Sequence, residues 1–166
     1  TEAEKIQIEQ EVEDGSCEFM HVHEEIVKKV EGVMPDEQQL LDLLAPPYIQ
    51  GLTLLGGEPF EPENQRVLVP FVRRVRETYP QKTVWAFSGF TLEELRTEGS
   101  HPRCEATDEL LSMLDVLVDG RFVEALKDIS LRFRGSSNQR LIDMKKTLAS
   151  GEIVLLPDLD RKPGQV

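Results

Sequence analysis

The chain has 166 residues, of which 39% are hydrophobic and 30% are charged, and its net charge is −12. This size suits one domain with its own hydrophobic core. The sequence holds no run of 18 apolar residues, which argues against a membrane-spanning helix, and no apolar stretch followed by a cleavage site near its start. We therefore expect a cytoplasmic protein without a membrane partner. The acidic balance also disfavours nucleic-acid binding.

The negative charge is concentrated at one end of the sequence. Residues 1–50 contain 3 basic and 13 acidic side chains, so they carry −10 of the net −12. Such a stretch is typical of a solvated face or a charged arm. We predict three parts: a divergent acidic segment over residues 1–37, an α/β domain over 38–157 and a frayed tail over 158–166.

The first third of the chain gives short and mixed patterns. Residues 4–14 alternate apolar and polar side chains, which predicts an edge strand or an extended arm. Residues 23–31 predict one or two helical turns. A further helix begins after Pro35-Asp36 and ends at Ala45-Pro46-Pro47, because proline cannot donate a backbone hydrogen bond and restricts the residue before it.

Strands and helices alternate over the rest of the chain. We expect short apolar strands at 49–55, 83–87 and 115–118, with less regular strands at 141–144 and 152–156 around a helical turn. The expected helices cover 64–79, begin at the capping box Thr91-Leu-Glu-Glu94, and run from a cap at Thr107 or Asp108 to Leu114. This alternation predicts βαβ units, right-handed crossovers and a parallel sheet.

Three turns that follow the expected strands contain glycine. They are Gly56-Gly57-Glu58-Pro59, Ser88-Gly89-Phe90 and Asp119-Gly120-Arg121-Phe122. Ligands of α/β proteins bind outside the carboxyl ends of parallel strands, and glycine lets a ligand approach the backbone closely. Glu58 is suitably placed to meet a charged amine. Taken alone, the first of these segments also fits an ordinary tight turn.

Four segments in order resemble a known family. Leu54–Phe60 is similar to the Gly-Gly-Glu motif of radical-SAM proteins, which contacts the amino group of S-adenosylmethionine. The others resemble elements of one branch of that superfamily, the activating subunit of anaerobic ribonucleotide reductase. These are Trp85–Phe90 with the following Leu-Glu-Glu-Leu, Asp115–Phe122, and the Arg-Gly-Ser-Ser-Asn-Gln-Arg stretch within Leu131–Arg140.

This resemblance implies an α/β fold that is a compact partial parallel (βα) barrel. It implies a [4Fe–4S] cluster that cleaves S-adenosylmethionine reductively, and a glycyl radical formed on the large subunit of the reductase, which is the expected partner. The radical chemistry would belong to the cofactor, with the protein positioning it. By resemblance the cofactor-binding residues are Gly56, Gly57, Glu58 and Pro59, with Ser88, Gly89 and Asp119 lining the same cavity and Arg134, Asn138 and Gln139 holding cofactor or partner.

The chain departs from the family in its cysteines. The family holds its cluster with a Cys-x3-Cys-x2-Cys triplet, whereas this sequence has only Cys17 and Cys104. Near the expected place stand Cys17, His21, His23 and Glu24. Either this loop binds a metal through mixed ligands, for example zinc in a regulatory module, or it is a divergent segment with an exposed thiol and ordinary histidines. We assign no metal ligand.

The missing triplet leaves two functions open. The chain is either an activase of the reductase or a non-catalytic relative that keeps the fold and binds S-adenosylmethionine or the reductase without a cluster. Arg132, Arg134 and Arg140 form a basic group that serves either surface salt bridges or a contact to cofactor or partner. We expect Cys104 to be a surface thiol and His101 an ordinary loop residue.

Overall fold

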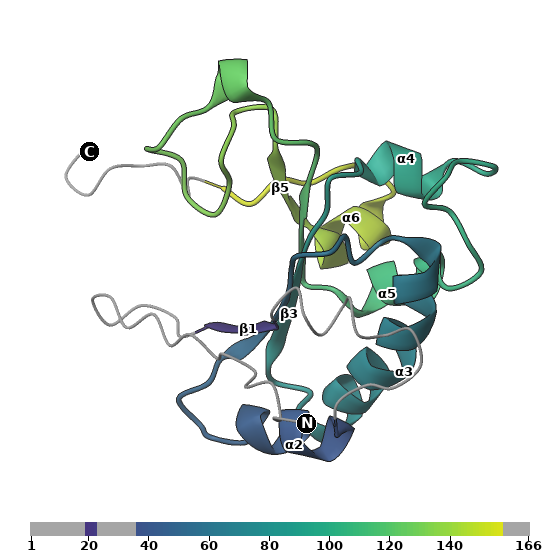
Figure 1. The fold of residues 1–166 in the computed structure, drawn as a ribbon, viewed down its shortest axis with the longest axis vertical. Helices are drawn as coiled ribbons and strands as arrows, with labels where there is room; N and C mark the ends of the chain where they lie inside the picture. Colours follow the sequence, from purple (N-terminus) through teal and green to yellow (C-terminus); the bar gives the residue numbers. More distant parts are fainter. Residues whose placement is uncertain (1–18, 23–35, 158–166) are drawn as a thin grey trace, which may run out of the picture.

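The computed structural model describes residues 19–22 and 36–157 (Figure 1). The predictions for 4–14, 23–31 and the tail at 158–166 lie outside the described residues. Among the described helices, none combines the length and apolar character needed to cross a bilayer. The elements are β1 (Phe19–Val22), α2 (Glu37–Leu44), β2 (Gly51–Leu54), α3 (Pro62–Thr78), β3 (Thr83–Phe87), α4 (Leu92–Arg96), α5 (Thr107–Met113), β4 (Val116–Asp119), the 3-10 helix η1 (Glu124–Leu126), β5 (Arg140–Asp143) and α6 (Met144–Ser150).

The strands form one sheet in the order β1-β2-β3-β4-β5. β1 to β4 run parallel, whereas β5 runs antiparallel to β4. The α/β class and the parallel sheet are therefore confirmed. The partial barrel is not confirmed, because among the described residues the sheet ends at β1 on one side and at the antiparallel β5 on the other. β1 comes from the acidic segment that we separated from the domain, and it pairs with β2.

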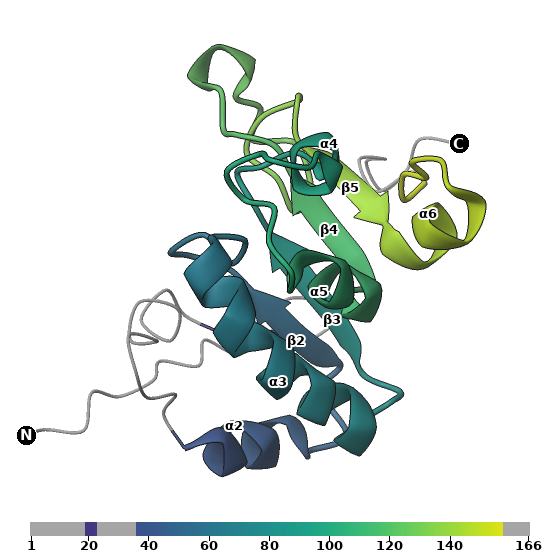
Figure 2. The same ribbon diagram turned by 90° about the vertical axis from the view of Figure 1, so that its right-hand side faces the viewer.

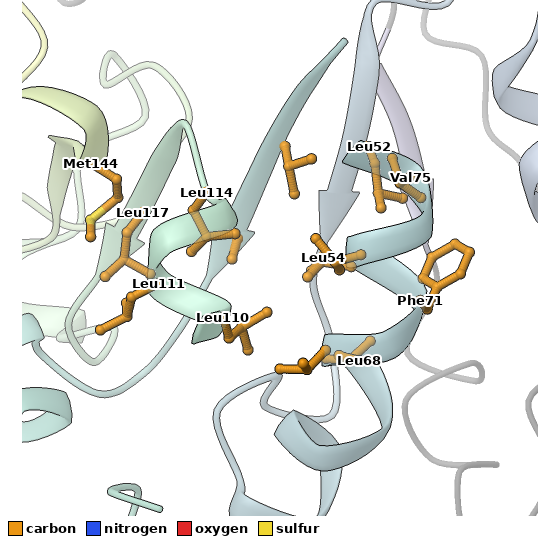
Figure 3. Packing of buried hydrophobic residues seen from close by; sticks show 14 of the residues in the cluster. Leu52, Leu54, Leu68, Phe71, Val75, Leu110, Leu111, Leu114, Leu117 and Met144 are labelled. Atoms are coloured by element: carbon orange, nitrogen blue, oxygen red, sulfur yellow. The ribbon is translucent and has the colours of Figure 1, made fainter. Parts of the chain in front are cut away.

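One face of the sheet carries the main core. Alternate residues of each strand point to the same face, and here Leu52, Leu54, Val84, Ala86 and Leu117 turn to the side that α3 and α5 cover (Figures 2 and 3). Each fully buried leucine contributes about 1.5–3 kcal/mol relative to exposure. Burial of these side chains fixes the strands beneath the two helices and so fixes where their carboxyl ends lie.

The spacing of Val67, Leu68, Phe71, Val72 and Val75 predicts a buried stripe, and α3 confirms it except at Val67, which is only partly buried. Leu68, Phe71, Val72 and Val75 recur at helical spacing and are at most 1% exposed. Pro62 occupies the first turn, where the missing N–H has no intrahelical partner in any case. Figure 3 shows Leu68 next to Leu110 of α5, and Val75 beside Leu52 of β2.

The opposite face of the sheet carries a smaller core, which the chain between β4 and β5 contacts through one aromatic ring. We call residues 120–139 the β4–β5 excursion; it rises from the carboxyl edge of the sheet in Figures 1 and 2. Trp85, Val116, Val118 and Leu141 form a second buried cluster on this face. The Phe133 ring of the excursion meets Trp85 edge-on, with 5.1 Å between the ring centroids.

The two N-caps predicted from the sequence have different outcomes. The capping box at Thr91 is confirmed, since its side chain accepts from the Glu94 N–H and Glu94 accepts from the Thr91 N–H. The predicted cap of α5 was wrong, because the N-cap is Ala106, whose methyl group cannot accept a hydrogen bond. Thr107 is fully buried, and its hydroxyl donates to Gln65 Oε1 at 2.7 Å. A tertiary contact therefore replaced the local capping bond.

Asp115, one residue before β4, joins three elements at the amino edge of the sheet. Its Oδ2 accepts from the Val84 N–H at 2.7 Å and from Arg76 Nη2 at 2.6 Å, and its Oδ1 lies 2.8 Å from Lys145 Nζ. Burial alone raises the pKa of this carboxyl. The hydrogen bonds from Lys145, Val84 and Arg76 outweigh burial and hold the pKa below its ordinary value.

The Asp115→Asn variant should lower the free energy of unfolding by about 1–3 kcal/mol near neutral pH, because an amide cannot accept from all three donors. A lowered folded-state pKa gives stability above the unfolded pKa that is lost as pH falls through the folded pKa. The gap between wild type and variant should therefore shrink below about pH 4. Urea unfolding at several pH values measures this. Glu109→Gln, which breaks the exposed pair with Arg73, is the control, and an equal loss in both variants would contradict the assignment.

Candidate functional site

Three turns meet at the carboxyl edge of the parallel strands. β2, β3 and β4 are parallel and hydrogen-bonded in that order, so their C-terminal ends Leu54, Phe87 and Asp119 lie along one edge. The predicted segments that begin at Gly56, Ser88 and Asp119 lie at these ends or within two residues of them. The edge is the place where ligands of open parallel sheets bind.

The Glu58 carboxylate joins the turn after β2 to the turn after β3. Its Oε1 accepts from the Ser88 hydroxyl at 2.7 Å and from the Phe60 N–H at 3.0 Å, and its Oε2 accepts from the Gly89 N–H at 2.7 Å. Hydrogen bonds to an ionised acceptor are about twice as strong as neutral ones. Glu58 therefore acts as a brace between the two turns, with its side-chain oxygens engaged inside the protein.

The backbone around Glu58 is held in an unusual conformation. Gly56, Gly57 and Glu58 have φ angles of 75°, 48° and 51°. Glycine adopts these angles freely, whereas a residue with a side chain pays about 1–2 kcal/mol. Asn64 stabilises the turn, because its Nδ2 donates to the carbonyls of Gly57 at 3.0 Å and Glu58 at 2.9 Å. Gly56 and Gly57 are half-exposed, so their backbone is accessible to a small polar ligand.

The turn after β3 is bonded from within and from its neighbours. The Ser88 N–H donates to the Val118 carbonyl at 2.9 Å, and the Phe90 N–H donates to the Ser88 hydroxyl at 3.0 Å. A Cβ on Gly89 would lie 3.4 Å from Glu58 Oε2. The glycine thus leaves the Glu58 carboxylate room to approach the backbone.

Asp119 takes a different position from the one expected of a cavity-lining residue. Its side chain is fully buried, and it accepts from the Leu92 N–H at 2.8 Å and from Arg140 Nε at 2.9 Å. Arg140 also bonds Glu93 through both terminal nitrogens. The hydrogen bond from Arg140 lowers the pKa of Glu93, and Asp119 raises the pKa of Arg140. Arg140 thus forms salt bridges to Asp119 and Glu93, and a contact of the arginine group to cofactor or partner stays a prediction.

The remaining predicted residues organise the β4–β5 excursion. Asn138 Nδ2 donates to the Arg121 carbonyl at 2.8 Å, and Gln139 Nε2 donates to the Gly120 carbonyl at 3.0 Å. Gln139 Oε1 also accepts from two N–H groups of the excursion. Arg134 lies half-buried in the same excursion. Asn138 and Gln139 therefore stabilise the turn after β4, whereas Ser88 and Gly89 contact Glu58 directly.

The sequence did not predict the roles of three neighbours of the turns. Asn64 gave no signal beyond its place in the first turn of α3. Phe90 is flanked by His101, with 5.9 Å between centroids, and by Arg121, whose guanidinium carbon lies 5.7 Å from the ring centroid. His101 also bonds Glu61 at 2.7 Å, so this loop residue ties the 97–106 loop to the start of α3.

The described residues do not fit a cluster held by three thiolates. The whole sequence has two cysteines, and Cys104 is partly buried with its Sγ 3.7 Å from the Thr107 hydroxyl. Across residues 19–22 and 36–157, no three His, Cys, Asp or Glu side chains gather as a metal site. Cys17, His23 and Glu24 lie outside these ranges, and only the backbone of His21 is described. The mixed-ligand hypothesis stays a prediction.

Comparison with known proteins gives the family. Residues 18–142, about three quarters of the chain, match the family described as a 4Fe-4S single cluster domain. The chain belongs to this family. Its sequence is 44% identical over 90 residues to the anaerobic ribonucleoside-triphosphate reductase-activating protein of Pasteurella multocida, covering 54% of this chain and 53% of that protein.

Other relatives carry the same name. The protein of Haemophilus influenzae is 41% identical over 105 residues, covering 62% of this chain and 63% of the relative. That of Enterobacteria phage T4 is 35% identical over 104 residues, covering 63% and 60%. The chain thus spans between about half and just under two thirds of these curated relatives. No solved structure matches it. The resemblance drawn from the four sequence segments is confirmed.

Replacing Glu58 with glutamine tests the brace. The amide places an N–H₂ group opposite one of three donors, so Glu58→Gln should lower the free energy of unfolding by about 1–3 kcal/mol. It should also speed hydrogen exchange at the Gly89 N–H. Urea unfolding and amide exchange by NMR measure the two effects. Glu63→Gln, an exposed change in the first turn of α3, is the matched control, and a wild-type exchange rate at Gly89 in Glu58→Gln would refute the brace.

Proposed function

We propose that this chain is the S-adenosylmethionine-binding part of an activating protein for an anaerobic ribonucleotide reductase. The bond between the Gly-Gly-Glu turn and the Ser88-Gly89 turn through Glu58 carries the proposal. This bond joins two segments that each resemble that family in sequence. The shared name of the relatives supports the same activity. The cytoplasmic location expected from the sequence stays a prediction.

The backbone of Gly56 and Gly57 is the part of this site that meets the ligand. The Glu58 oxygens are engaged by Ser88, Gly89 and Phe60, so the side chain orients the turn and the half-exposed backbone beside it receives the amino acid end of S-adenosylmethionine. A backbone held in a left-handed conformation binds with little loss of entropy, since it is already ordered.

The finer fold follows the same family. Parallel strands in sequential order with helices on one face are the arrangement from which (βα) barrels are built. β1 to β4 have that order, and α3 and α5 cover one face (Figure 2). We propose that these four strands correspond to part of a radical-SAM barrel, with the antiparallel β5 closing the described sheet.

The family's reaction forms a glycyl radical on the reductase after reductive cleavage of S-adenosylmethionine at a [4Fe–4S] cluster. The two cysteines of this sequence are too few to form the family's cluster-binding triplet. No step of the chemistry is therefore assigned to the residues of this chain. The same observation favours a second candidate function. A relative that binds S-adenosylmethionine or the reductase without a cluster needs the turns at the sheet edge and no thiolates.

Binding of S-adenosylmethionine tests the proposed site. Equilibrium dialysis with labelled S-adenosylmethionine should show saturable binding to the wild-type chain, and Gly57→Ala should weaken it about tenfold. Gly99→Ala is the control, because Gly57 and Gly99 both have positive φ and an alanine at either position meets similar backbone strain. Gly99 lies in the 97–106 loop, and no neighbour is within 4 Å of an added Cβ. Gly99→Ala should therefore bind normally. Absence of binding to the wild type would refute the proposal.

Anaerobic reconstitution with iron and sulfide separates the two candidate functions. About four irons per chain and cleavage of S-adenosylmethionine on reduction would support the activase. Binding of S-adenosylmethionine without iron would support the cluster-free relative. Stoichiometric zinc that is lost in Cys17→Ser would support the zinc module.

The reductase should dock on the β4–β5 excursion beside the site. Four large apolar side chains of the excursion are at least 41% exposed, Ile129 at 95%, and residues 120–139 hold four basic and two acidic side chains in a chain of net charge −12. Ile129→Asp should weaken binding of the large reductase subunit about tenfold, because it places a charge in an apolar contact. Surface plasmon resonance measures this. Leu148→Asp on α6, where Leu148 is 43% exposed, is the control, and equal binding by both variants would contradict this docking site.

A further inference from the structure

An ion pair between buried Asp119 and half-buried Arg140 lies behind the turn that follows β3. Asp119 ends β4 and is fully buried. Its Oδ1 accepts from Arg140 Nε at 2.9 Å, and its Oδ2 accepts from Arg140 Nη2 at 2.5 Å and from the Leu92 N–H at 2.8 Å. Arg140 begins β5 and also bonds the two Glu93 oxygens at 3.0 and 2.6 Å. One guanidinium therefore joins β4, β5 and α4.

The shape of arginine is what allows this connection. The planar guanidinium presents donors on two edges in fixed directions, so it bonds two carboxylates at once with defined geometry. A lysine ammonium keeps the charge but lacks that geometry. Asp119 adds the third contact, because the same oxygen that bonds Arg140 accepts the N–H of the first residue of α4.

The connection continues directly to the candidate site. α4 begins at Leu92, only three residues after Gly89, whose N–H bonds Glu58. The Ser88–Thr91 turn is therefore held at its C-terminal end by Asp119 and at its N-terminal end by Glu58. Movement of α4 relative to β4 would shift the Ser88 and Gly89 donors from the Glu58 carboxylate.

Stability alone does not account for a charged group at position 119. Asp119 lies two residues from Leu117 and on the same face of the sheet, where the neighbouring strand positions are apolar. Replacing a buried ion pair with packed apolar residues is often neutral or stabilising. What an apolar residue cannot supply is the directed acceptance of the Leu92 N–H and of the Arg140 guanidinium.

We propose that Arg140 and Asp119 are positioning residues for S-adenosylmethionine. They fix α4 and the Ser88–Gly89 turn against Glu58, and through Glu58 they fix the Gly56–Gly57 backbone that receives the ligand. This inference rests on the proposed function, and it gives Asp119 a role behind the site. Arg140 belongs to the Arg-Gly-Ser-Ser-Asn-Gln-Arg stretch, so the same contact connects that stretch to the Gly-Gly-Glu turn, although Arg140 lies 82 residues beyond Glu58.

The test compares Arg140→Lys and Arg140→Met with Arg103→Met. Arg103 is a matched control, because it also bonds two carboxylates, Glu98 and Asp108, and its side chain is only 16% exposed, but it lies in the 97–106 loop. Affinity for labelled S-adenosylmethionine is measured by equilibrium dialysis well below the unfolding temperature of each variant. Exchange of the Gly89 and Leu92 amide hydrogens is measured by NMR without ligand.

Arg140→Met should weaken S-adenosylmethionine binding about tenfold and speed exchange at both amides, and Arg140→Lys should restore only part of the affinity. Arg103→Met should lose stability but keep wild-type affinity. If Arg140→Met does not fold, Glu93→Gln, which keeps the Arg140–Asp119 pair, should weaken binding by a smaller factor. Wild-type affinity in the folded Arg140 or Glu93 variants would overturn the positioning role, whereas a wild-type chain that binds no S-adenosylmethionine would overturn the proposed function itself.

Discussion

The candidate site depends on one carboxylate that accepts three hydrogen bonds. Glu58 receives donors from its own turn and from Ser88 and Gly89, which lie in the turn after β3, the next strand along the sheet. A half-buried charge is stable only when such donors are in place, so the two turns and the carboxylate hold one another. The left-handed backbone at Gly56 and Gly57 follows from this, because the chain must reverse to bring Glu58 against the next turn.

Two aspartates at the two ends of β4 make similar contacts at opposite edges of the sheet. Asp115 precedes the strand and accepts from an arginine and from the Val84 N–H. Asp119 ends the strand and accepts from another arginine and from the Leu92 N–H. In each case the carboxylate accepts from a backbone N–H near the start of the neighbouring element, which is β3 for Asp115 and α4 for Asp119. The apolar face between them supplies most of the burial, while the two charged groups set direction, which non-directional apolar packing does not provide.

The family description and the cysteine content bear on different parts of the chain. The family is described by a 4Fe-4S cluster, whose thiolates this sequence does not supply, since it has two cysteines in all. The turns at the sheet edge are complete and mutually bonded. The proposed binding of S-adenosylmethionine and the proposed docking of the reductase therefore rest on described residues, whereas a cluster held by three thiolates would need more cysteines than the two in this sequence.

The sequence by itself determined the elements whose signals are local. The strand at Thr83–Phe87, the buried stripe of α3 and the capping box at Thr91 were all predictable, because helical and strand periodicity and capping act between residues at most about four positions apart. Motif resemblance also located the turns that meet at the sheet edge. Only the tertiary structure decided which groups meet there, since the deciding contacts join residues 21 to 47 positions apart in the chain. These long-range outcomes are the bond from Ser88 to Glu58, the burial of Asp119, the double pairing of Arg140, the use of Thr107 inside the core, and the antiparallel direction of β5.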